Sequence, residues 1–220
     1  MNADLTHVDT WIFDLDNTLY PPEREVLQAV NDKMTAFTMR VTGLPWDDAL
    51  ALQHKYHHEL GATLTGLMRD HGVDPAEFLD AAHDVMLDHL EPDLPLERAL
   101  GRLPGRRLVF TNGSAKHAER VLGALGVAHR FDDVFHIEAA ELVPKPRPEA
   151  FERLMRAHDV RPRASAFFED LERNLKPAAE IGMTTVLVGP RALQVDEPFV
   201  HHRALELVPF LDSARVEKAA

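Results

Sequence analysis

Two aspartates stand one residue apart near the start of the chain, where the apolar run of "TWIFDLDNTLY" ends. In one crevice, Asp14 and Asp16 would repel each other, so the pair needs a compensating cation or a shared proton. Two such carboxylates can act as a nucleophile and as a general acid or base. An acidic turn that caps a helix would explain the same pattern without any chemistry.

Two later clusters could recognise an anion. In "FTNGS", Thr111, Asn112 and Gly113 offer hydroxyl and backbone N–H donors that can surround an oxyanion. Lys145 lies between prolines in "VPKPRP", which stiffen the backbone around it. Its ammonium could pair with a carboxylate and a phosphate together. A helix cap and a solvated lysine are the structural alternatives.

A second acidic pair, Glu169 and Asp170, ends the apolar run in "SAFFED". Carboxylate oxygens at the end of a strand suit a hard cation such as Mg²⁺, although a helix N-cap would use the same residue types. Each of the four clusters closes a predicted strand or a strand-to-helix turn. Their common position favours one shared site over four separate structural roles.

Strands and helices are predicted to alternate around these clusters. The strands are Val8–Phe13, Arg106–Thr111, the segment "DVFHIEA", Ala164–Asp170 and Thr184–Gly189, and the helices are Ala115–Leu125, Arg147–His158 and Leu171–Ile181. A short strand near Val200 and an amphipathic helix from about Leu205 would follow. This alternation predicts a parallel sheet that is covered on both faces, with ligands bound outside the carboxyl ends of the strands.

The segment between the first two strands reads as helical. From Glu23 to Leu90 apolar residues recur at helical spacing, with breaks at "TGLP" and "HGVDP". The sequence therefore predicts an α/β fold, a doubly wound Rossmann-like core of residues 1–20 and 96–220. A helical cap, residues 21–95, is inserted after the first strand. Hinges near Tyr20–Pro22 and Glu91–Pro95 would let the cap open and close.

Composition excludes several classes of function. Acidic residues outnumber basic ones 36 to 24 among 220 residues, and this net charge of −12 disfavours binding to a nucleic acid polymer. The absence of cysteine excludes thiolate metal sites and thiol nucleophiles. No apolar stretch approaches the roughly 20 residues of a membrane-spanning helix. The N-terminus lacks the features of a signal peptide, so a cytoplasmic location without a membrane partner is expected.

The order of the four clusters resembles that of the haloacid dehalogenase-like superfamily. Its motifs match "FDLDNTL", "FTNGS", Lys145 in "PKPRP" and "FFEDLERN". The resemblance implies that Asp14 takes a phosphoryl group to form an aspartyl-phosphate, while Asp16 acts first as general acid and then as base. Dehalogenases of this superfamily lack the second acid because halide leaves without a proton, so Asp16 favours a phosphatase or a phosphomutase.

The resemblance also implies the remaining site residues. Mg²⁺ would be the cofactor, bound by Asp14, the backbone carbonyl of Asp16, Asp170 and, directly or through water, Glu169. The phosphate would be held by Thr111, the amides of Asn112 and Gly113, and Lys145. Asn174, four residues after Asp170, could orient the acidic loop.

A closer resemblance is to the pyrimidine 5′-nucleotidase family, through "DLDNTLYP", "HELGATLTGLMRDHGVDP", "LEPD", "FTNGSAKHAERVLGALGV" and "TTVLVG". It implies that the chain releases phosphate from nucleotides such as UMP and CMP. The sequence departs from the pattern at Leu60, where many relatives carry tyrosine, and at Glu169, where aspartate is common. Candidate substrate contacts are Tyr56, His57, Thr63, Arg69 and His117, although helix packing or a solvated face would also explain them.

Two other functions share much of this pattern. A hexose phosphomutase or a sugar-phosphate phosphatase would use every core residue and differ only in the cap. A phospho-acceptor signalling module also combines an acid pair, a hydroxyl, a lysine and Mg²⁺ on a doubly wound sheet. Its phosphorylated aspartate ends the third strand, however, and this chain has no matching isolated aspartate. We therefore expect the partner to be a small phosphomonoester, and in particular a nucleotide.

Overall fold

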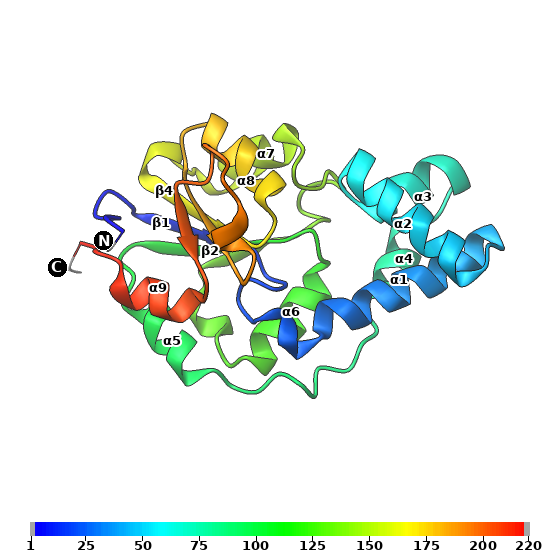
Figure 1. Ribbon diagram of the computed structural model, residues 1–220, viewed down its shortest axis with the longest axis horizontal. Coiled ribbons are helices and arrows are strands. Elements are labelled where there is room, and N and C mark those ends of the chain that lie inside the picture. Colours follow the sequence, from blue (N-terminus) through cyan, green and yellow to red (C-terminus); the bar gives the residue numbers. More distant parts are fainter. Residues whose placement is uncertain (1–2, 218–220) are drawn as a thin grey trace.

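A six-stranded parallel sheet forms the centre of the computed structural model, which describes residues 3–217. The strands are β1 Thr10–Phe13, β2 Arg106–Phe110, β3 Asp133–Phe135, β4 Ser165–Glu169, β5 Thr184–Val188 and β6 His202–Ala204. Their order across the sheet is β3-β2-β1-β4-β5-β6, and every neighbouring pair is parallel. The predicted doubly wound α/β fold is confirmed (Figure 1).

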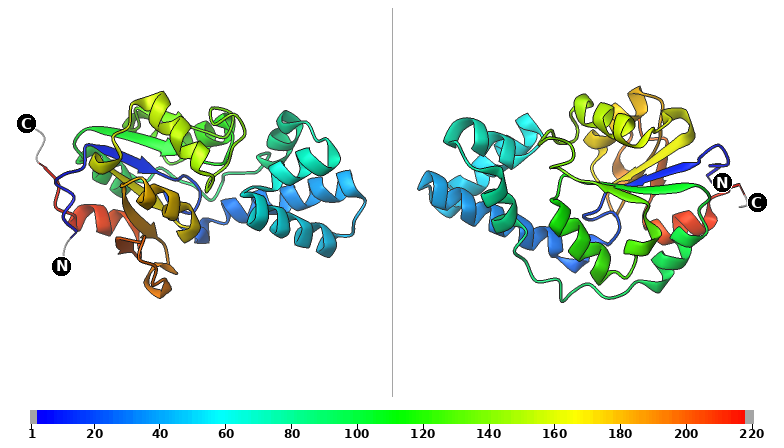
Figure 2. Two further views of the ribbon diagram at one scale, coloured as in Figure 1. Left: turned by 90° about the horizontal axis from the view of Figure 1, so that it is seen from above. Right: turned by 180° about the vertical axis from the view of Figure 1, so that it is seen from behind.

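Helices cover both faces of this sheet (Figures 1 and 2). Those of the core are α5 Leu94–Gly101, α6 Ala115–Ala124, α7 Pro148–His158, α8 Glu172–Glu180 and α9 Leu207–Ser213. Buried residues of α5, α6 and α9 belong to one apolar cluster, and those of α7 and α8 belong to another. Because crossovers of a parallel sheet place helices on its faces, the strands between them are buried on both sides.

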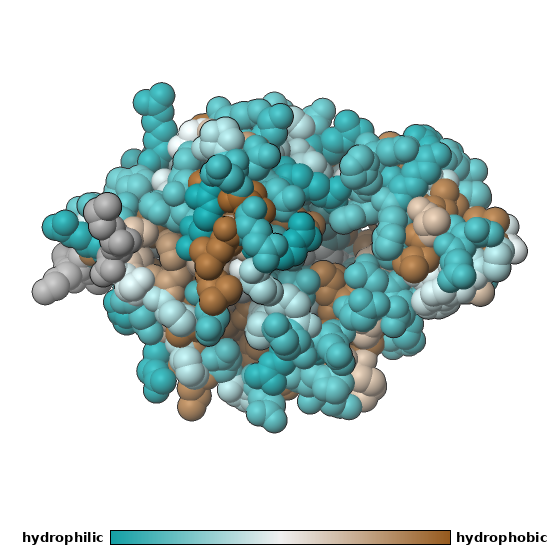
Figure 3. All heavy atoms as spheres, in the orientation of Figure 1, coloured by the Kyte–Doolittle hydropathy of each residue, from teal (hydrophilic) through white to brown (hydrophobic). Residues whose placement is uncertain are grey.

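Four helices between β1 and β2 form a second, helical body, the cap. They are α1 Val26–Thr42, α2 Trp46–Leu60, α3 Thr63–His71 and α4 Pro75–Ala82. Gly43 and Gly72 end α1 and α3 with φ angles of 72° and 64°, a left-handed conformation that glycine adopts without steric cost. These are the breaks predicted from "TGLP" and "HGVDP". The surface is hollowed between the cap and the core (Figure 3).

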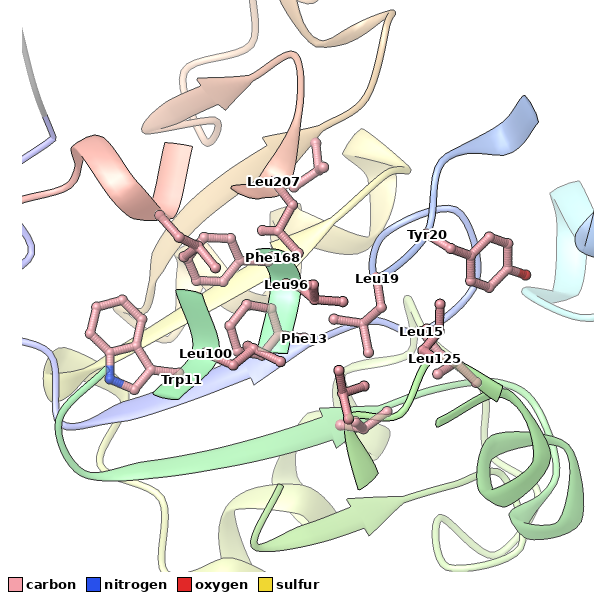
Figure 4. Packing of buried hydrophobic residues seen from close by; sticks show 14 of the residues in the cluster. Trp11, Phe13, Leu15, Leu19, Tyr20, Leu96, Leu100, Leu125, Phe168 and Leu207 are labelled. Carbon is pink, nitrogen blue, oxygen red and sulfur yellow. The ribbon is translucent and has the colours of Figure 1, made fainter. Parts of the chain in front are cut away.

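Strand β1 carries the first acidic pair into the middle of the molecule. All four of its residues are buried; Trp11 and Phe13 pack into one apolar cluster while Ile12 packs into the other. Phe13 stacks on Phe168 of β4 with 4.7 Å between ring centroids (Figure 4). Burying side chains of this size contributes about 1.5–3 kcal/mol each, so the position of β1 is strongly fixed.

The third predicted strand is shorter than expected. Strand β3 ends at Phe135, whereas the sequence predicted that it would continue through "DVFHIEA". Beyond Phe135 the chain keeps one bond to the neighbouring segment, from Ile137 N to Gly113 O at 3.1 Å, and then turns through a local bond from Ala140 N to His136 O at 3.0 Å. In this turn the Glu138 carboxylate accepts the N–H of Ala115 at the start of α6, where the partial positive charge of the helix favours an acid.

The C-terminal strand and helix occur as predicted, as β6 and α9. Among residues 3–217, none of the helices has the length and apolar character needed to cross a membrane.

Candidate active site

Three neighbouring strands bring the acidic and hydroxyl residues to one edge of the sheet. Phe13 of β1 is paired with Val109 of β2 and with Phe168 of β4. The residues that follow each strand, beginning with Asp14 and Thr111, therefore lie side by side. Because the strands are parallel, all of their carboxyl ends meet at this edge.

Lys145 joins the two acidic clusters. It lies in the loop before α7 and is 1% exposed, and its Nζ donates to Asp14 Oδ1 at 2.6 Å and to Glu169 Oε2 at 2.8 Å. Its third bond goes to the carbonyl oxygen of Phe110 at 2.8 Å. The three donors of the ammonium are thus satisfied inside the protein.

The loop that carries Lys145 is fixed by Asn112. The Asn112 side chain accepts the N–H of Lys145 at 2.8 Å and donates to the Lys145 carbonyl at 3.1 Å. The cap approaches this loop at Gly61, where a methyl group would lie 3.1 Å from the Lys145 carbonyl oxygen. Gly61 has a φ of 88°, so both its backbone conformation and the close approach favour glycine.

Negative charge exceeds positive charge at this buried centre. Burial lowers the pKa of Lys145, but Asp14 and Glu169 outweigh that effect and hold the pKa above its ordinary value. Burial and the repulsion from Glu169 raise the pKa of Asp14 from 3.8 to about 7, although Lys145 opposes them. The same two causes raise the pKa of Asp170 well above 3.8. A second cation would relieve this repulsion.

The residues present fit a hard divalent cation. Asp14, Glu169 and Asp170 each offer a carboxylate oxygen, and these oxygens lie within 4.8 Å of one another. An all-oxygen set suits Mg²⁺ better than a softer metal. Glu169 is partly engaged already, because its Oε2 accepts from Lys145 and its Oε1 from the N–H of Leu171. Asp14 is engaged in the same way, because its Oδ1 accepts from Lys145 at 2.6 Å and its Oδ2 from Thr18 Oγ1 at 3.3 Å.

The "FTNGS" segment forms the turn between β2 and α6. The N–H of Gly113 donates to Thr111 Oγ1 at 2.9 Å, so the segment curls around the hydroxyl. Ser114 is the N-cap of α6, and its Oγ accepts the N–H of His117 at 3.2 Å. The helix-cap explanation thus holds for Ser114, while Thr111, Asn112 and Gly113 line the site.

Asp16 lies in the loop after β1 and accepts two hydrogen bonds on one oxygen. Its Oδ1 is 2.6 Å from the Tyr20 hydroxyl and 2.8 Å from His117 Nε2. Burial raises the pKa of Asp16, but the adjacent His117 and the hydrogen bonds that His117 and Tyr20 donate hold it below its ordinary value.

A cavity of about 640 Å³ extends from this edge of the sheet to the cap. Its core side contains the predicted residues Asp14, Asp16, Thr111, Asn112, Gly113, Lys145, Glu169, Asp170 and Asn174. The Asn174 side chain is 3% exposed, and its oxygen lacks a hydrogen-bond partner among residues 3–217. The structure thus gathers every core residue that the sequence singled out.

The predicted substrate contacts divide into two groups. Thr63 and His57 line the cavity. The imidazole of His57 is engaged by Arg173 of α8, 2.5 Å from its Nε2, and burial together with this positive charge lowers the pKa of His57 to about 4. His57 thus joins the cap to the core as a neutral acceptor.

The other predicted contacts lie elsewhere. Tyr56 packs against Gly66 inside the cap, and its hydroxyl donates to Asp70 at 2.8 Å. Arg69 is on the cap surface, paired with Asp70. His117 is wholly buried and faces Asp16. Helical spacing places these residues on their helices but does not separate a packed face from one that opens on a cavity.

The sequence did not place Tyr20, His83 or Asn31 in the site. Tyr20 belongs to "DLDNTLY" and could have been recognised by its place four residues after Asp16. His83 and Asn31 line the cavity from the cap without any motif around them. Only the fold brings them to the site.

Comparison with known proteins agrees with this geometry. The sequence model of the haloacid dehalogenase-like hydrolases matches residues 8–182. The chain belongs to this family. The predicted superfamily is thereby confirmed, and the protein is a hydrolase of that type.

Two curated relatives and one solved structure illustrate its similarities. Phosphate metabolism protein 8 of Saccharomyces cerevisiae is 29% identical over 194 residues, 80% of this chain and 60% of that protein. Fructose-1-phosphate phosphatase YqaB of Escherichia coli is 29% identical over 185 residues, 80% of this chain and 93% of that protein. The 2-haloacid dehalogenase of Pseudomonas syringae has the same fold, with a TM-score of 0.57, 20% identity and coverage of 94% and 97%.

Proposed function

We propose that this hydrolase is a Mg²⁺-dependent phosphomonoesterase that works through an aspartyl-phosphate on Asp14. The observation that carries the proposal is the arrangement of three groups at one sheet edge. Lys145 holds the Asp14 carboxylate at 2.6 Å, and Asp16 stands two residues further on with one carboxylate oxygen already bonded. A nucleophile and a separate acid are therefore present together.

In the first step an Asp14 oxygen attacks phosphorus and the bond from phosphorus to the ester oxygen breaks. Asp16 gives its proton to that oxygen, so the alcohol leaves neutral. Lys145 and the donors around Thr111 stabilise the charge that develops on the phosphoryl oxygens. One residue could not do both tasks, because Asp14 is bonded to phosphorus while the proton moves.

In the second step water attacks the phosphorus of the aspartyl-phosphate. Asp16, now ionised, takes the proton from this water, and the bond between phosphorus and Asp14 breaks to release inorganic phosphate. Asp14 returns as a carboxylate and Asp16 as an acid, so the cycle closes. Mg²⁺ held by Asp14, Asp170, the Asp16 carbonyl and Glu169 would neutralise charge on the carboxylates and the phosphate.

A pyrimidine nucleoside 5′-monophosphate is the proposed substrate. The cap side of the cavity combines apolar and amide side chains: Leu27, Val30, Asn31, Met34, Gln53, Leu64, Phe78 and Leu79. Thr35 Oγ1 is 2.6 Å from Gln53 Oε1, and Gln53 Nε2 is 3.3 Å from Asn31 Oδ1, so the two amides are held in place. Apolar walls with a fixed amide suit the faces and the polar edge of a base.

A sugar phosphate is the second candidate. The E. coli relative carries fructose-1-phosphate phosphatase in its name, and the alignment spans 93% of that protein. A sugar carries hydroxyl groups around its ring, so it offers the apolar residues of this cap wall less apolar surface than the face of a base does. The lining therefore favours a nucleotide.

Phosphate release from a panel of phosphomonoesters tests both levels of the proposal. The panel contains UMP, CMP, dTMP, AMP, GMP and several sugar phosphates, each with Mg²⁺ and with EDTA. Mg²⁺-dependent release concentrated on UMP and CMP is expected. Release mainly from sugar phosphates would support the proposed role of Asp14 and would reject a nucleotide as the substrate. No release, with a stable phosphoprotein formed from a small phosphodonor, would favour a signalling module.

A further inference from the structure

The two hydrogen bonds to Asp16 fall on the same oxygen. Both the Tyr20 hydroxyl and His117 Nε2 contact Oδ1, at 2.6 Å and 2.8 Å. The other oxygen, Oδ2, lies on the side of the "FTNGS" turn: a methyl group at Gly113 would be 3.7 Å from it and 3.2 Å from Thr111 Oγ1. Asp16 thus has one occupied oxygen and one that faces the region where the phosphate would be held.

The surroundings of His117 determine which of its nitrogens carries hydrogen. The side chain is wholly buried, and Nδ1 has no hydrogen-bond partner among residues 3–217. An N–H at this nitrogen would be buried and unsatisfied, at a cost of about 1–3 kcal/mol. The hydrogen therefore belongs on Nε2, where it points to Asp16. If the imidazole ring were flipped, Nε2 would no longer face Asp16 and this hydrogen bond would be lost.

Further contacts keep the imidazole of His117 in this orientation. Its ring stacks on that of His83, with 4.5 Å between centroids. His83 Nδ1 is 3.0 Å from the hydroxyl of Ser114, the N-cap of the helix that carries His117. Arg120, on the same helix as His117, links this helix to the segment that carries His83. It donates to the carbonyls of His83 and Val85 at 2.8 and 2.6 Å.

Tyr20 is held equally firmly from the other side. It is 2% exposed and lies at the edge of the main apolar cluster, on the loop after β1, with its hydroxyl directed away from the cluster (Figure 4). The ring is fixed by packing, so its hydroxyl reaches Asp16 without a large loss of side-chain freedom. The Asp16 carboxylate therefore receives two preorganised donors from separate parts of the core.

We infer that Tyr20 and His117 are positioning residues that occupy Oδ1 of Asp16, so that Oδ2 alone carries the transferred proton. The arrangement accommodates both forms of the acid. When Oδ2 bears the proton, Oδ1 is the carbonyl oxygen and accepts both donors; after the proton has left, the same donors bind the carboxylate. The carboxyl plane and the direction of Oδ2 do not change during turnover. This inference rests on the proposed phosphatase chemistry.

The consequence is a dependence on the leaving group. An alkoxide is a strong base and must receive the proton from Asp16, whereas p-nitrophenolate leaves with little help. A variant that misdirects Oδ2 will therefore lose more activity toward an alkyl phosphate than toward p-nitrophenyl phosphate. The ratio kcat/KM isolates this effect, because it contains only the steps up to release of the alcohol. General loss of folded protein would lower both values equally.

Tyr20→Phe and His117→Leu test the inference, with UMP and p-nitrophenyl phosphate as substrates. For UMP we expect kcat/KM to fall by about tenfold to a hundredfold, part of the 10²–10⁴-fold that general acids supply. For p-nitrophenyl phosphate the fall should be at least several times smaller. His117→Gln retains an N–H donor and should recover part of the loss. Glucose 6-phosphate, also an alkyl ester, replaces UMP if the enzyme prefers sugars.

Tyr56→Phe is the matched control. It removes the hydroxyl of the only other tyrosine in the chain, one that bonds Asp70 within the cap. Its kcat/KM should stay near the wild-type value for both substrates. Equal losses on both substrates in Tyr20→Phe and His117→Leu, with an active wild-type enzyme, would overturn the inference alone. A wild-type enzyme that releases no phosphate from either kind of substrate would overturn the proposed function, and the inference with it.

Discussion

Replacing Lys145 by methionine tests the charge balance of the site directly. Methionine has a similar length, so the change removes the ammonium without opening a large cavity. Three charge-assisted hydrogen bonds are lost, to Asp14 Oδ1, Glu169 Oε2 and the carbonyl oxygen of Phe110. The two carboxylates are then left in a buried site without the cation between them.

The size of the effect follows from these contacts. Each of these charge-assisted hydrogen bonds contributes about 1.5–3 kcal/mol, while the variant no longer bears the cost of burying an ammonium. A net loss of about 3–5 kcal/mol in the free energy of unfolding is expected, the range seen when one partner of a buried ion pair is removed. The loss should shrink at low pH, because protonation of Asp14 relieves the repulsion.

Urea unfolding in EDTA at pH 8 and pH 5 measures these values by linear extrapolation. Lys116→Met is the matched control, since Lys116 forms a single ion pair with Asp80 at 3.1 Å on the surface, where both side chains are at least 70% exposed. This control should change stability very little, because exposed pairs are screened by water and salt. A loss below about 1 kcal/mol for Lys145→Met at pH 8 would refute the buried-charge reasoning.

Three further predictions concern Asp14, the metal and the "FTNGS" turn. Asp14→Asn should abolish turnover of every substrate, and normal phosphate release from that variant would reject the aspartyl-phosphate. In EDTA the free energy of unfolding should fall as pH rises from about 4 to 7: the pKa of Asp14 rises from 3.8 to about 7 on folding, so the folded state binds more protons in this window. Adding Mg²⁺ should reduce that fall, because the cation favours ionised carboxylates. Urea unfolding at pH 5 and 8, with and without Mg²⁺, measures both effects, and a free energy of unfolding that does not respond to Mg²⁺ would contradict the prediction. Gly113→Ala should lower kcat/KM by about tenfold or more, since its methyl group would lie 3.1 Å from the His117 ring and 3.2 Å from Thr111 Oγ1, and unchanged kinetics would show that the turn can relax.

The core of the site could be predicted from the sequence for a simple physical reason. Three of the four clusters follow an apolar run, and the carboxyl ends of parallel strands meet at one edge, which Lys145 reaches from the loop before α7. Asp14 and Asp170 are far apart in the chain. However, Phe13 and Phe168, which precede the two acidic pairs, are paired on the neighbouring strands β1 and β4. Local patterns were sufficient because the sheet converts strand ends into neighbours.

The cap could be predicted only in outline. Helical spacing and the glycines at positions 43 and 72 located its helices, but Tyr56 and Arg69 were indistinguishable from residues that line a cavity. Which face of a helix meets a cavity depends on how α2 and α3 pack on their neighbours. That packing is a tertiary property and leaves little trace in spacing.

The surroundings of Asp16 were decided by the tertiary structure alone. His117 lies 101 residues from Asp16 in the chain, and His83 reaches the site from the end of a cap helix. The sequence by itself predicted that the two aspartates lie together at one edge of the sheet, because a strand end and a residue type define their position. Which oxygen of Asp16 faces the site was fixed only by folding, since hydrogen-bond direction depends on where distant side chains finally lie.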